Sequence, residues 1–532
     1  MIGSGSNRVR YAIEAWIIVI GVVFATPGVA TDNPNLAQKS IDVDVSRPFD
    51  ALRQDEMGRM RSYFQSASWE YPIPRITSEK LKLIGLRGVR LINVESNRAV
   101  RSVRADGTLS FDFSVLLPAL ADCRRYRLIP HIVVGQRMQD RLAIRGKLAD
   151  YGIADRRAYE DYAFALMKFV VEDQGLSNAD FEVANEPDTN GAAWLLEGAH
   201  ASGAPEMYDA YLALYETWAK AADRLTRAFP DAHIRLGGPA LTPFTLHYGE
   251  LEWARQFIAD VARRRLRLDF FSVHLYGDQQ ALRGAPPNSP YPSLADGLAH
   301  YRRLLKESGL ARVPLYVTEW GACSDTGDSP CGATNADEAG AAWAARFVIE
   351  MAGDGVDEGI ALVLRDHLTE DGTRDNLSWP AFLLADGQTP KALYNVARLF
   401  RRMGDRRWAA SGGDDATTVL ASSSGSRVTV MVVNQQWDFS RSVDEATPTR
   451  LSVTVRPWHS RSDRVNFVRY VIDRNHSNVY RSRQPGARGV KAELQSAEQG
   501  IAKVVNGALH LPSVIAEPSS ITYWEITDYQ RR

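Results

Sequence analysis

Two glutamates at predicted strand ends are the residues of this chain best suited to chemistry. Glu186 follows an apolar run at 181–183 and precedes Pro187, which cannot donate to a sheet and should end the strand. Glu319 ends a similar run that begins at Leu315. Two carboxyl groups about 5–5.5 Å apart can cleave a glycosidic bond with retention, one as nucleophile and one as acid and then base. For Glu186 alone, a solvated side chain at a strand-to-turn junction is the alternative.

The segments that would position both glutamates alternate between strand and helix patterns. Strand patterns occur at 89–94, 128–134, 181–183, 234–236, 270–276, 315–320 and 360–364, and a helical pattern follows each. This alternation predicts a parallel sheet. With one more strand between about 60 and 69, the pattern predicts an α/β fold of the (β/α)8 TIM barrel type, with Glu186 and Glu319 ending the fourth and seventh strands at one rim. A doubly wound open sheet is the alternative, although no Gly-x-Gly-x-x-Gly follows any strand.

The pattern of the sequence changes after Trp408. Short alternating runs separated by Ser, Gly, Asp and Pro occur at 417–420, 427–433, 451–455, 467–472 and 523–526. Such spacing predicts a β-sandwich. We therefore expect a barrel at 31–405 and a C-terminal β-sandwich accessory domain at 406–532, and residues 41–45, which also alternate, could pair with the latter.

The N-terminus has the pattern of a targeting segment. Arg8 and Arg10 precede an apolar run at 15–25, and small residues at 28–30 end the segment. This predicts a signal peptide at 1–30, cleaved before Thr31. The apolar run is shorter than the ~20 residues of a spanning helix. We expect export to the periplasm or the medium, with membrane contact only if the leader is retained as an anchor.

Charge and cysteine content limit the other partners. The 532 residues include 63 Lys plus Arg and 64 Asp plus Glu, so a net charge of −1 predicts no nucleic-acid binding. Cys323 and Cys331 lie in one loop and can form a disulfide in an oxidising compartment or remain free, whereas Cys123 lies in a helical pattern typical of a buried thiol. No Cys-x-x-Cys or His-Glu-x-x-His spacing occurs, so we expect neither metal nor cofactor.

On these motifs the chain resembles glycoside hydrolase family 39, within a clan of retaining (β/α)8 glycosidases. Further matches follow in family order at 235–239, 269–276, 390–394 and 472–478. The resemblance implies that Glu186, after Asn at the end of strand four, is the acid/base. It implies that Glu319, within Thr-Glu-Trp at the end of strand seven, is the nucleophile. It also implies that Asn185 hydrogen-bonds the sugar 2-hydroxyl.

Three more side chains are candidates for the same site. His274 and Tyr276 lie near the predicted rim of one strand, and the resemblance implies that Tyr276 orients the nucleophile. Both could instead be structural residues of an apolar strand. Arg90 could hold Glu319 ionised, because a nearby cation favours the carboxylate; a surface arginine is the alternative.

The chain departs from the family pattern at two places. Ala184 stands where the family has Trp or another large residue, and Leu-Arg-Asp-His at 364–367 replaces an aromatic platform beneath the sugar. This change removes an apolar contact surface and adds charge. Trp320, Trp379 and Trp194 could supply other stacking faces or lie in the core.

We therefore expect an exported retaining glycosidase that acts on a β-linked oligo- or polysaccharide, such as a bacterial exopolysaccharide or a xylose-containing chain. Another family of the clan, such as an endo-glucanase or mannanase, is one alternative. A non-catalytic glycan-binding protein or polysaccharide-export partner on a barrel scaffold is another. The paired glutamates weigh against it, because binding alone needs no acid and nucleophile.

Overall fold

The computed structural model describes most of the chain from residue 36 to residue 529. The gaps are 50–54, 69–70, 74–75, 77, 97, 104–107, 137–155, 190–204, 243–251, 279–292, 326–329, 370–371, 373–374, 437–445, 459–462 and 486–487. The expected leader at 1–30 and Trp194 lie outside the described residues. Residues from Ala37 onward form one compact unit.

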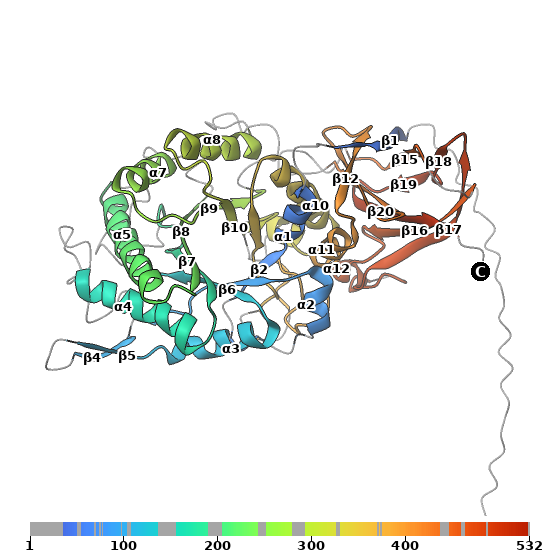
Figure 1. Cartoon of the computed structure of the whole chain (residues 1–532). Helices are drawn as coiled ribbons and strands as arrows, with labels where there is room; N and C mark the ends of the chain where they lie inside the picture. The colour runs from blue at the N-terminus through green and yellow to red at the C-terminus, as the bar shows by residue number, and fades with distance from the viewer. Residues whose placement is uncertain are drawn as a thin grey trace, which may run out of the picture. The chain divides into compact units, whose positions relative to one another are not determined.

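Eight parallel strands close into a barrel in the order β10-β11-β2-β3-β6-β7-β8-β9 (Figure 1). The strands are β2 (Gln65–Ser68), β3 (Gly88–Leu91), β6 (Ile129–Val134), β7 (Asn178–Val183), β8 (His233–Leu241), β9 (Phe270–Tyr276), β10 (Leu315–Gly321) and β11 (Glu358–Ala361). The predicted TIM barrel is confirmed and the open sheet is wrong. The eighth strand is β2, inside the window expected for it, so Glu186 and Glu319 follow or end the fourth and seventh strands in chain order.

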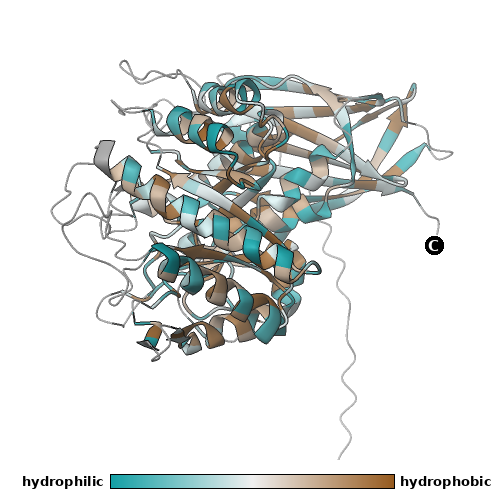
Figure 2. Ribbon diagram, turned by 60° about the vertical axis from the view of Figure 1, so that its left-hand side comes forward, coloured by the Kyte–Doolittle hydropathy of each residue, from teal (hydrophilic) through white to brown (hydrophobic). Residues whose placement is uncertain are grey.

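Helices follow the strands on the outside of the barrel. They are α1 (Glu56–Ser62), α2 (Ser78–Ile84), α3 (Leu117–Tyr126), α4 (Arg156–Lys168), α5 (Pro205–Ala228), α7 (Trp253–Arg264), α8 (Leu294–Glu307), α9 (Pro330–Thr334), α10 (Glu338–Gly353) and α11 (Ala392–Arg402). Most alternate between hydrophilic and hydrophobic residues along their length, as amphipathic helices do (Figure 2). In α10 the side chain of Asp337 caps the helix by accepting from the backbone N–H of Ala339.

A ten-stranded sheet forms the C-terminal part, in the order β1-β12-β13-β14-β20-β16-β17-β18-β15-β19. Its strands are β1 (Ala37–Pro48), β12 (Arg406–Ser411), β13 (Thr417–Ser424), β14 (Arg427–Gln435), β15 (Thr449–Arg456), β16 (Arg464–Ile472), β17 (Gln495–Val505), β18 (Ala508–His510), β19 (Val514–Ala516) and β20 (Ser519–Asp528). Residues 41–45 lie in β1, which pairs with β12 and, in parallel, with β15. The sheet thus returns on itself around an apolar core that includes Val430 and Trp524, as a sandwich-type domain does.

Barrel and sheet share buried apolar surface. One cluster of buried side chains runs from Phe347 of α10 and Phe400 of α11 to Met431 of β14 and Tyr523 of β20. A shared core of this kind fixes α10 and α11 against the sheet. Among the described residues, no helix has both the length and the apolar character that crossing a bilayer requires.

Candidate active site

The turn after β7 holds Glu186 in an unusual backbone conformation. Ala184 and Glu186 have φ of 68° and 50°, in the left-handed region that residues other than glycine rarely adopt. Each such residue costs on the order of 1–3 kcal/mol. Neighbouring strands hold the turn, because Ala184 N donates to Val134 O at 2.7 Å and Glu186 N donates to Ala240 O at 3.1 Å. Strain maintained by the surroundings is typical of functional sites.

The glycine pair of the 235–239 motif lets β8 pack closely against Phe270 and Tyr211. A Cβ on Gly237 would lie 2.3 Å from the carbonyl oxygen of Phe270 on β9, and one on Gly238 would lie 2.9 Å from the Tyr211 hydroxyl. Neither position therefore has room for a side chain. The motif that the sequence singled out is thus a packing requirement next to Glu186.

Glu319 is held at the end of β10 by two donors. Arg90 Nη1 donates to Oε1 at 2.6 Å, and the Tyr276 hydroxyl donates to Oε2 at 2.6 Å. Burial raises the pKa of Glu319, but the charges of His274 and Arg90 outweigh burial and leave the pKa below its usual value. The carboxylate is therefore ionised at neutral pH, as a nucleophile must be.

His274 lies between the two carboxylates. Its Nδ1 is 2.8 Å from Glu186 Oε1 and 3.6 Å from Glu319 Oε2. Burial lowers the pKa of His274, but the charge of Glu319 and the hydrogen bond to Glu186 raise it above the usual value. The Glu186 side chain is 29% exposed and that of Glu319 only 10%. The two acids thus differ in environment, with Glu186 the more accessible to water and to a leaving group.

The separation of the carboxylates indicates what they can do together. One ligand atom each from Glu186, His274 and Glu319 lie within 4.8 Å of one another. This is close to the spacing of about 5–5.5 Å in retaining glycosidases, whereas inverting enzymes need about 6.5–9.5 Å to admit a water. The arrangement can support attack on an anomeric carbon by one acid and protonation of the leaving oxygen by the other.

Among the residues that the structure describes, two groups of side chains have the spacing of metal ligands. The trio of Glu186, His274 and Glu319 is one, but the buried Arg90 guanidinium already donates to Glu319 and would repel a cation. The second joins Asp278 to Cys323 and Cys331. Those cysteines are bonded to each other, with Cα atoms 5.8 Å apart, so they offer no thiolates.

Arg90, on β3, contacts three side chains and is fully buried. Its Nε donates to Glu182 Oε2 at 2.7 Å, its Nη1 to Glu319, and its Nη2 to Asn185 Oδ1 at 2.8 Å. The alternative of a surface arginine is therefore wrong. Because Asn185 Oδ1 accepts from Arg90, its NH2 group is the part that a sugar hydroxyl can use. We call Glu186, Glu319, His274 and Arg90 the rim cluster.

Sequence reasoning missed the charged residues beneath the rim cluster. His131 Nε2 lies 3.4 Å from Glu182 Oε2, and His131 Nδ1 lies 3.4 Å from Asp180 Oδ2. Asp180 in turn accepts from Arg235. Burial raises the pKa of Glu182, but Arg90 and His131 hold it well below its usual range. Burial lowers the pKa of His131, but bonds to Asp180 and Glu182 raise it to about 9.

These residues form a column of alternating charge inside the barrel. A signal for it exists in the sequence, since acids stand at alternate positions, 180 and 182, between the apolar residues Ala179, Phe181 and Val183. Side chains two apart in a strand share a face. Both acids therefore had to point into the barrel together.

The expectation that Trp320 contacts substrate is wrong. Its ring is fully buried, packs against Phe64 and Phe347, and its indole N–H donates to the Tyr63 carbonyl at 3.0 Å. Neighbours in a strand point to opposite faces, so Trp320 faces the helices while Glu319 faces the barrel mouth.

The segment at 364–367, which follows β11, presents less charge than its sequence suggests. Asp366 and Lys391 pair at 2.8 Å, and neither side chain is exposed. Trp379 is half-buried, lies 4.7 Å from the His367 ring and packs against the apolar cluster that contains Tyr276. Three tryptophans were candidates for contact with substrate. Of these, Trp379 is the one whose described neighbours include a site residue, Tyr276.

A disulfide closes the loop that follows Glu319. Asn335 fixes this loop by accepting from Cys323 N at 3.1 Å and donating to Cys323 O at 2.9 Å. Of the two alternatives that the sequence left open for Cys323 and Cys331, the structure contains the disulfide. Cys123 is buried, which raises the pKa of its thiol to about 12, so it is unreactive at neutral pH.

Comparison with known proteins gives a consistent result. The model of glycosyl hydrolases family 39 matches residues 65–492. A β-xylosidase from Geobacillus stearothermophilus is 24% identical over 398 residues, which cover 70% of this chain and 71% of that protein. The structure is similar to that of a monomeric β-xylosidase from Caulobacter crescentus CB15, with a TM-score of 0.65, 17% identity, and coverage of 92% of this chain and 100% of the other. A family 39 enzyme from Xanthomonas axonopodis pv. citri has a TM-score of 0.65, 16% identity, and coverage of 94% and 100%. At these identities the structural matches support the fold alone.

Proposed function

The chain belongs to glycosyl hydrolases family 39 and is a retaining glycoside hydrolase, and we propose that it cleaves a β-linked glycan by double displacement between Glu319 and Glu186. The observation that carries this proposal is the approach of the two carboxylates, within 4.8 Å, in unequal environments. The chemistry that such a pair performs has two steps.

In the first step a carboxylate oxygen of Glu319 attacks the anomeric carbon. The bond from that carbon to the leaving oxygen breaks, and Glu186 gives its proton to the leaving oxygen. The product is an ester between the sugar and Glu319. In the second step Glu186, now a carboxylate, takes a proton from water as the water oxygen attacks the same carbon, and the ester bond to Glu319 breaks.

Arg90 and Tyr276 act as positioning residues for Glu319. Their two hydrogen bonds fix both carboxylate oxygens, so little reorganisation is needed before attack. When the ester forms, Glu319 loses its charge. Glu182 remains bonded to Arg90, so the guanidinium does not become an unpaired buried cation.

Asn185 and His274 complete the active site on the side of Glu186. Asn185 is held through its oxygen by Arg90, which directs its NH2 group away as a donor for a sugar hydroxyl. A hydrogen bond to the 2-hydroxyl that strengthens in the transition state contributes to such reactions. His274 fixes the carboxyl group of Glu186 relative to Glu319 through its 2.8 Å contact.

Two variants test the assignment of roles. Glu319→Gln should lower kcat by about five orders of magnitude, the scale of losing a nucleophile, with unchanged thermal unfolding. Glu186→Ala should retain activity on aryl glycosides with good leaving groups, which need no proton, and lose it on alkyl glycosides. Unchanged turnover in Glu319→Gln would overturn the nucleophile assignment, and an equal loss on both substrate types would overturn the acid assignment. The first-formed product should keep the anomeric configuration by proton NMR.

The choice of test substrates starts from the β-xylosidase relative. Because a curated relative is a β-xylosidase, aryl β-xylosides are the first members of a panel that also contains β-glucosides, β-mannosides and the matching polysaccharides. Release of long fragments from a glucan or mannan would favour endo action. Binding without turnover on every member would favour a non-catalytic glycan-binding protein.

Export is also part of the proposal. The leader pattern at 1–30 and the disulfide between Cys323 and Cys331 support it, because structural disulfides are typical of oxidising compartments. Expression of the full chain in a Gram-negative host followed by N-terminal sequencing should give periplasmic protein that begins at Thr31. Protein that stays in the cytoplasm with an intact N-terminus would contradict export.

A further inference from the structure

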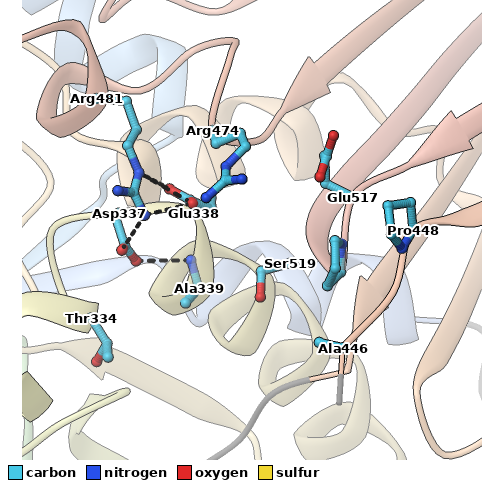
Figure 3. A pocket seen from close by; sticks show the side chains of 11 residues that line it. Thr334, Asp337, Glu338, Ala339, Ala446, Pro448, Arg474, Arg481, Glu517 and Ser519 are labelled. Carbon is cyan, nitrogen blue, oxygen red and sulfur yellow. Dashed lines mark hydrogen bonds and ion pairs between the residues drawn. The ribbon is translucent and has the colours of Figure 1, made fainter. Parts of the chain in front are cut away.

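A cavity of about 660 Å³ lies between the start of α10 and the C-terminal sheet (Figure 3). Asp337, Glu338 and Ala339 line it from the barrel, and Arg474, Pro448 and Glu517 line it from the sheet. Its volume is within the range of about 300–1,000 Å³ that is typical of ligand sites, which often lie at domain boundaries. It is separate from the rim cluster, since the two share no residue.

The cavity opens on the same face of the barrel as the rim cluster. Glu319 lies two residues before the end of β10, and the chain then continues through Cys323, Cys331 and α9 to the start of α10. In a (β/α)8 barrel, helices begin at the face where strands end. Asn335, which lies two residues before Asp337 and bonds to Cys323, ties this wall of the cavity to the segment that follows the strand of Glu319.

Arg481 is not available to a ligand in this cavity. It donates to Glu338 Oε1 at 2.8 Å and Oε2 at 2.9 Å, and to Asp337 Oδ2 at 3.2 Å. Figure 3 shows its guanidinium turned toward these two carboxylates. We call Asp337, Glu338 and Arg481 the α10 cluster.

Two charged side chains of the described lining remain available, those of Arg474 and Glu517. Within the described part of the chain, neither the Arg474 guanidinium nor the Glu517 carboxylate has a hydrogen-bond or ion-pair partner, and Figure 3 shows both beside the open space. The positive charge of Arg474 and the negative charge of Glu517 therefore sum to zero. A charged ligand would gain one contact and be repelled by the other, and an anion would also meet the acids of α10. The cavity therefore favours a neutral ligand that both donates and accepts.

Vicinal sugar hydroxyls meet this requirement. They accept hydrogen bonds from a guanidinium and donate to a carboxylate, and such charge-assisted bonds are stronger than neutral ones. Pro448, Pro518, Ala339 and Ala446 add apolar surface for the C–H face of a pyranose ring. We propose that the cavity is a second glycan-binding site, which takes neutral pyranose units through Arg474 and Glu517; the choice of a glycan rests on the proposed function.

The consequence of such a site is substrate retention. A chain bound here stays near the same barrel face as the rim cluster, which raises its effective concentration at the carboxylates. Long glycans should benefit and short aryl glycosides should not. The cavity should therefore favour long substrates over short ones, whatever sugar the active centre accepts.

Calorimetry on the Glu319→Gln variant tests binding without turnover. The probes are β-1,4-linked disaccharides of xylose, glucose and mannose, and an aldobiouronic acid as the charged arm. At least one neutral disaccharide should bind at two sites per chain, and Arg474→Ala or Glu517→Gln should weaken one of them at least about tenfold, the scale of one charge-assisted hydrogen bond. Arg47→Ala, which changes an exposed arginine of β1 in the same sheet, is the matched control and should leave both sites unchanged.

Kinetics with Glu319 intact supply the second readout. Arg474→Ala should raise KM for a hexasaccharide of the preferred sugar at least about fivefold and leave kcat and KM for the aryl glycoside unchanged. A single binding site for every neutral probe, two sites unaffected by Arg474→Ala, or tighter binding of the uronic acid would overturn the proposal. Absence of all turnover in the wild-type chain would count against the proposed function alone, because the binding count does not depend on it.

Discussion

The rim cluster and the α10 cluster bury acids to a similar degree, but the pKa values of those acids shift in opposite directions. Burial raises the pKa of Glu319 and of Asp337 alike. At the rim, Arg90 and His274 reverse the effect and the pKa of Glu319 falls below its usual value. In the α10 cluster the neighbouring Glu338 adds to burial, and the pKa of Asp337 rises to about 7. The number of cations per carboxylate, not the depth of burial, decides the charge.

The number of cations per carboxylate differs because the two clusters are built differently. Glu319 lies within 3.6 Å of two cations, and Glu182 beneath it lies within 3.4 Å of Arg90 and His131. Asp337 and Glu338 are neighbours in sequence and, in the described part of the chain, both form their ion pairs with Arg481. A barrel interior can gather cations from several strands around one acid, whereas a helix start places two acids side by side. The first arrangement suits a nucleophile, and the second suits a structural contact.

Removing the arginine from each cluster should separate the two regions most clearly. Arg90→Met should lower kcat by about 10²–10³, the scale of losing one preorganised charge donor. The acidic limb of kcat/KM should move to higher pH, because the pKa of Glu319 rises without its neighbouring cation. Arg90→Lys should keep the limb closer to that of the wild type. A pH–rate profile measures both effects.

The same change in the other cluster is the control. Arg481→Met should leave kcat and the acidic limb for an aryl glycoside unchanged, while lowering the melting temperature. Equal effects of the two substitutions on the pH profile would contradict the comparison.

Glu182→Gln should sharpen the comparison with a smaller effect of opposite sign. Without the negative charge of Glu182, Arg90 acts on Glu319 alone, so the pKa of Glu319 falls and the acidic limb moves to lower pH. We expect kcat to drop about tenfold, because the bond that Arg90 donates to a carboxylate at position 182 becomes a weaker bond to a neutral amide oxygen. A limb at the wild-type position would show that Glu182 only fills space. The shift in pH separates a positioning role from a structural one.

Asp337→Asn should have the smallest effect and should act on stability. The pKa of Asp337 in the folded chain, about 7, lies above its ordinary value of 3.8. Its contribution to folding is therefore fully present below about pH 4 and is lost as pH rises through 7. Asn caps a helix as well as Asp does. Relative to wild type, the variant should gain on the order of 1 kcal/mol between pH 5 and pH 8 in urea unfolding. A constant difference across that range would mean that Asp337 stays ionised.

Much of the site could be predicted from strand periodicity. Glu186 and Glu319 were placed at one rim because parallel strands of a barrel end on the same face. His274 and Tyr276, two positions apart on β9, had to share a face, and the structure brings both to Glu319. The same rule, applied one residue beyond Glu319, would have placed Trp320 in the outer core. That error came from residue type overriding periodicity.

Strands with weak patterns could not be predicted. The hairpin of β4 (Val100–Val103) and β5 (Leu109–Phe111), and the polar strand β17, lack a clear alternation of apolar residues. Their conformation depends on the partner strand, and β-propensity largely reflects such contacts. The cavity beside α10 is equally invisible in sequence, since its lining joins residues from 334 to 519.

The sequence by itself determined the order of strands and helices, the acids at the ends of two strands, and the family. It did so because hydrophobic periodicity and turn residues are local signals. Only the tertiary structure decided which charges meet. Arg90 joins Glu182 and Glu319, which stand 92 and 229 positions away in sequence, through closure of the barrel. Electrostatic energies depend on distances in space and on exclusion of water, so the lowered pKa of Glu319 and the raised pKa of Asp337 follow from the folded arrangement and not from the order of residues.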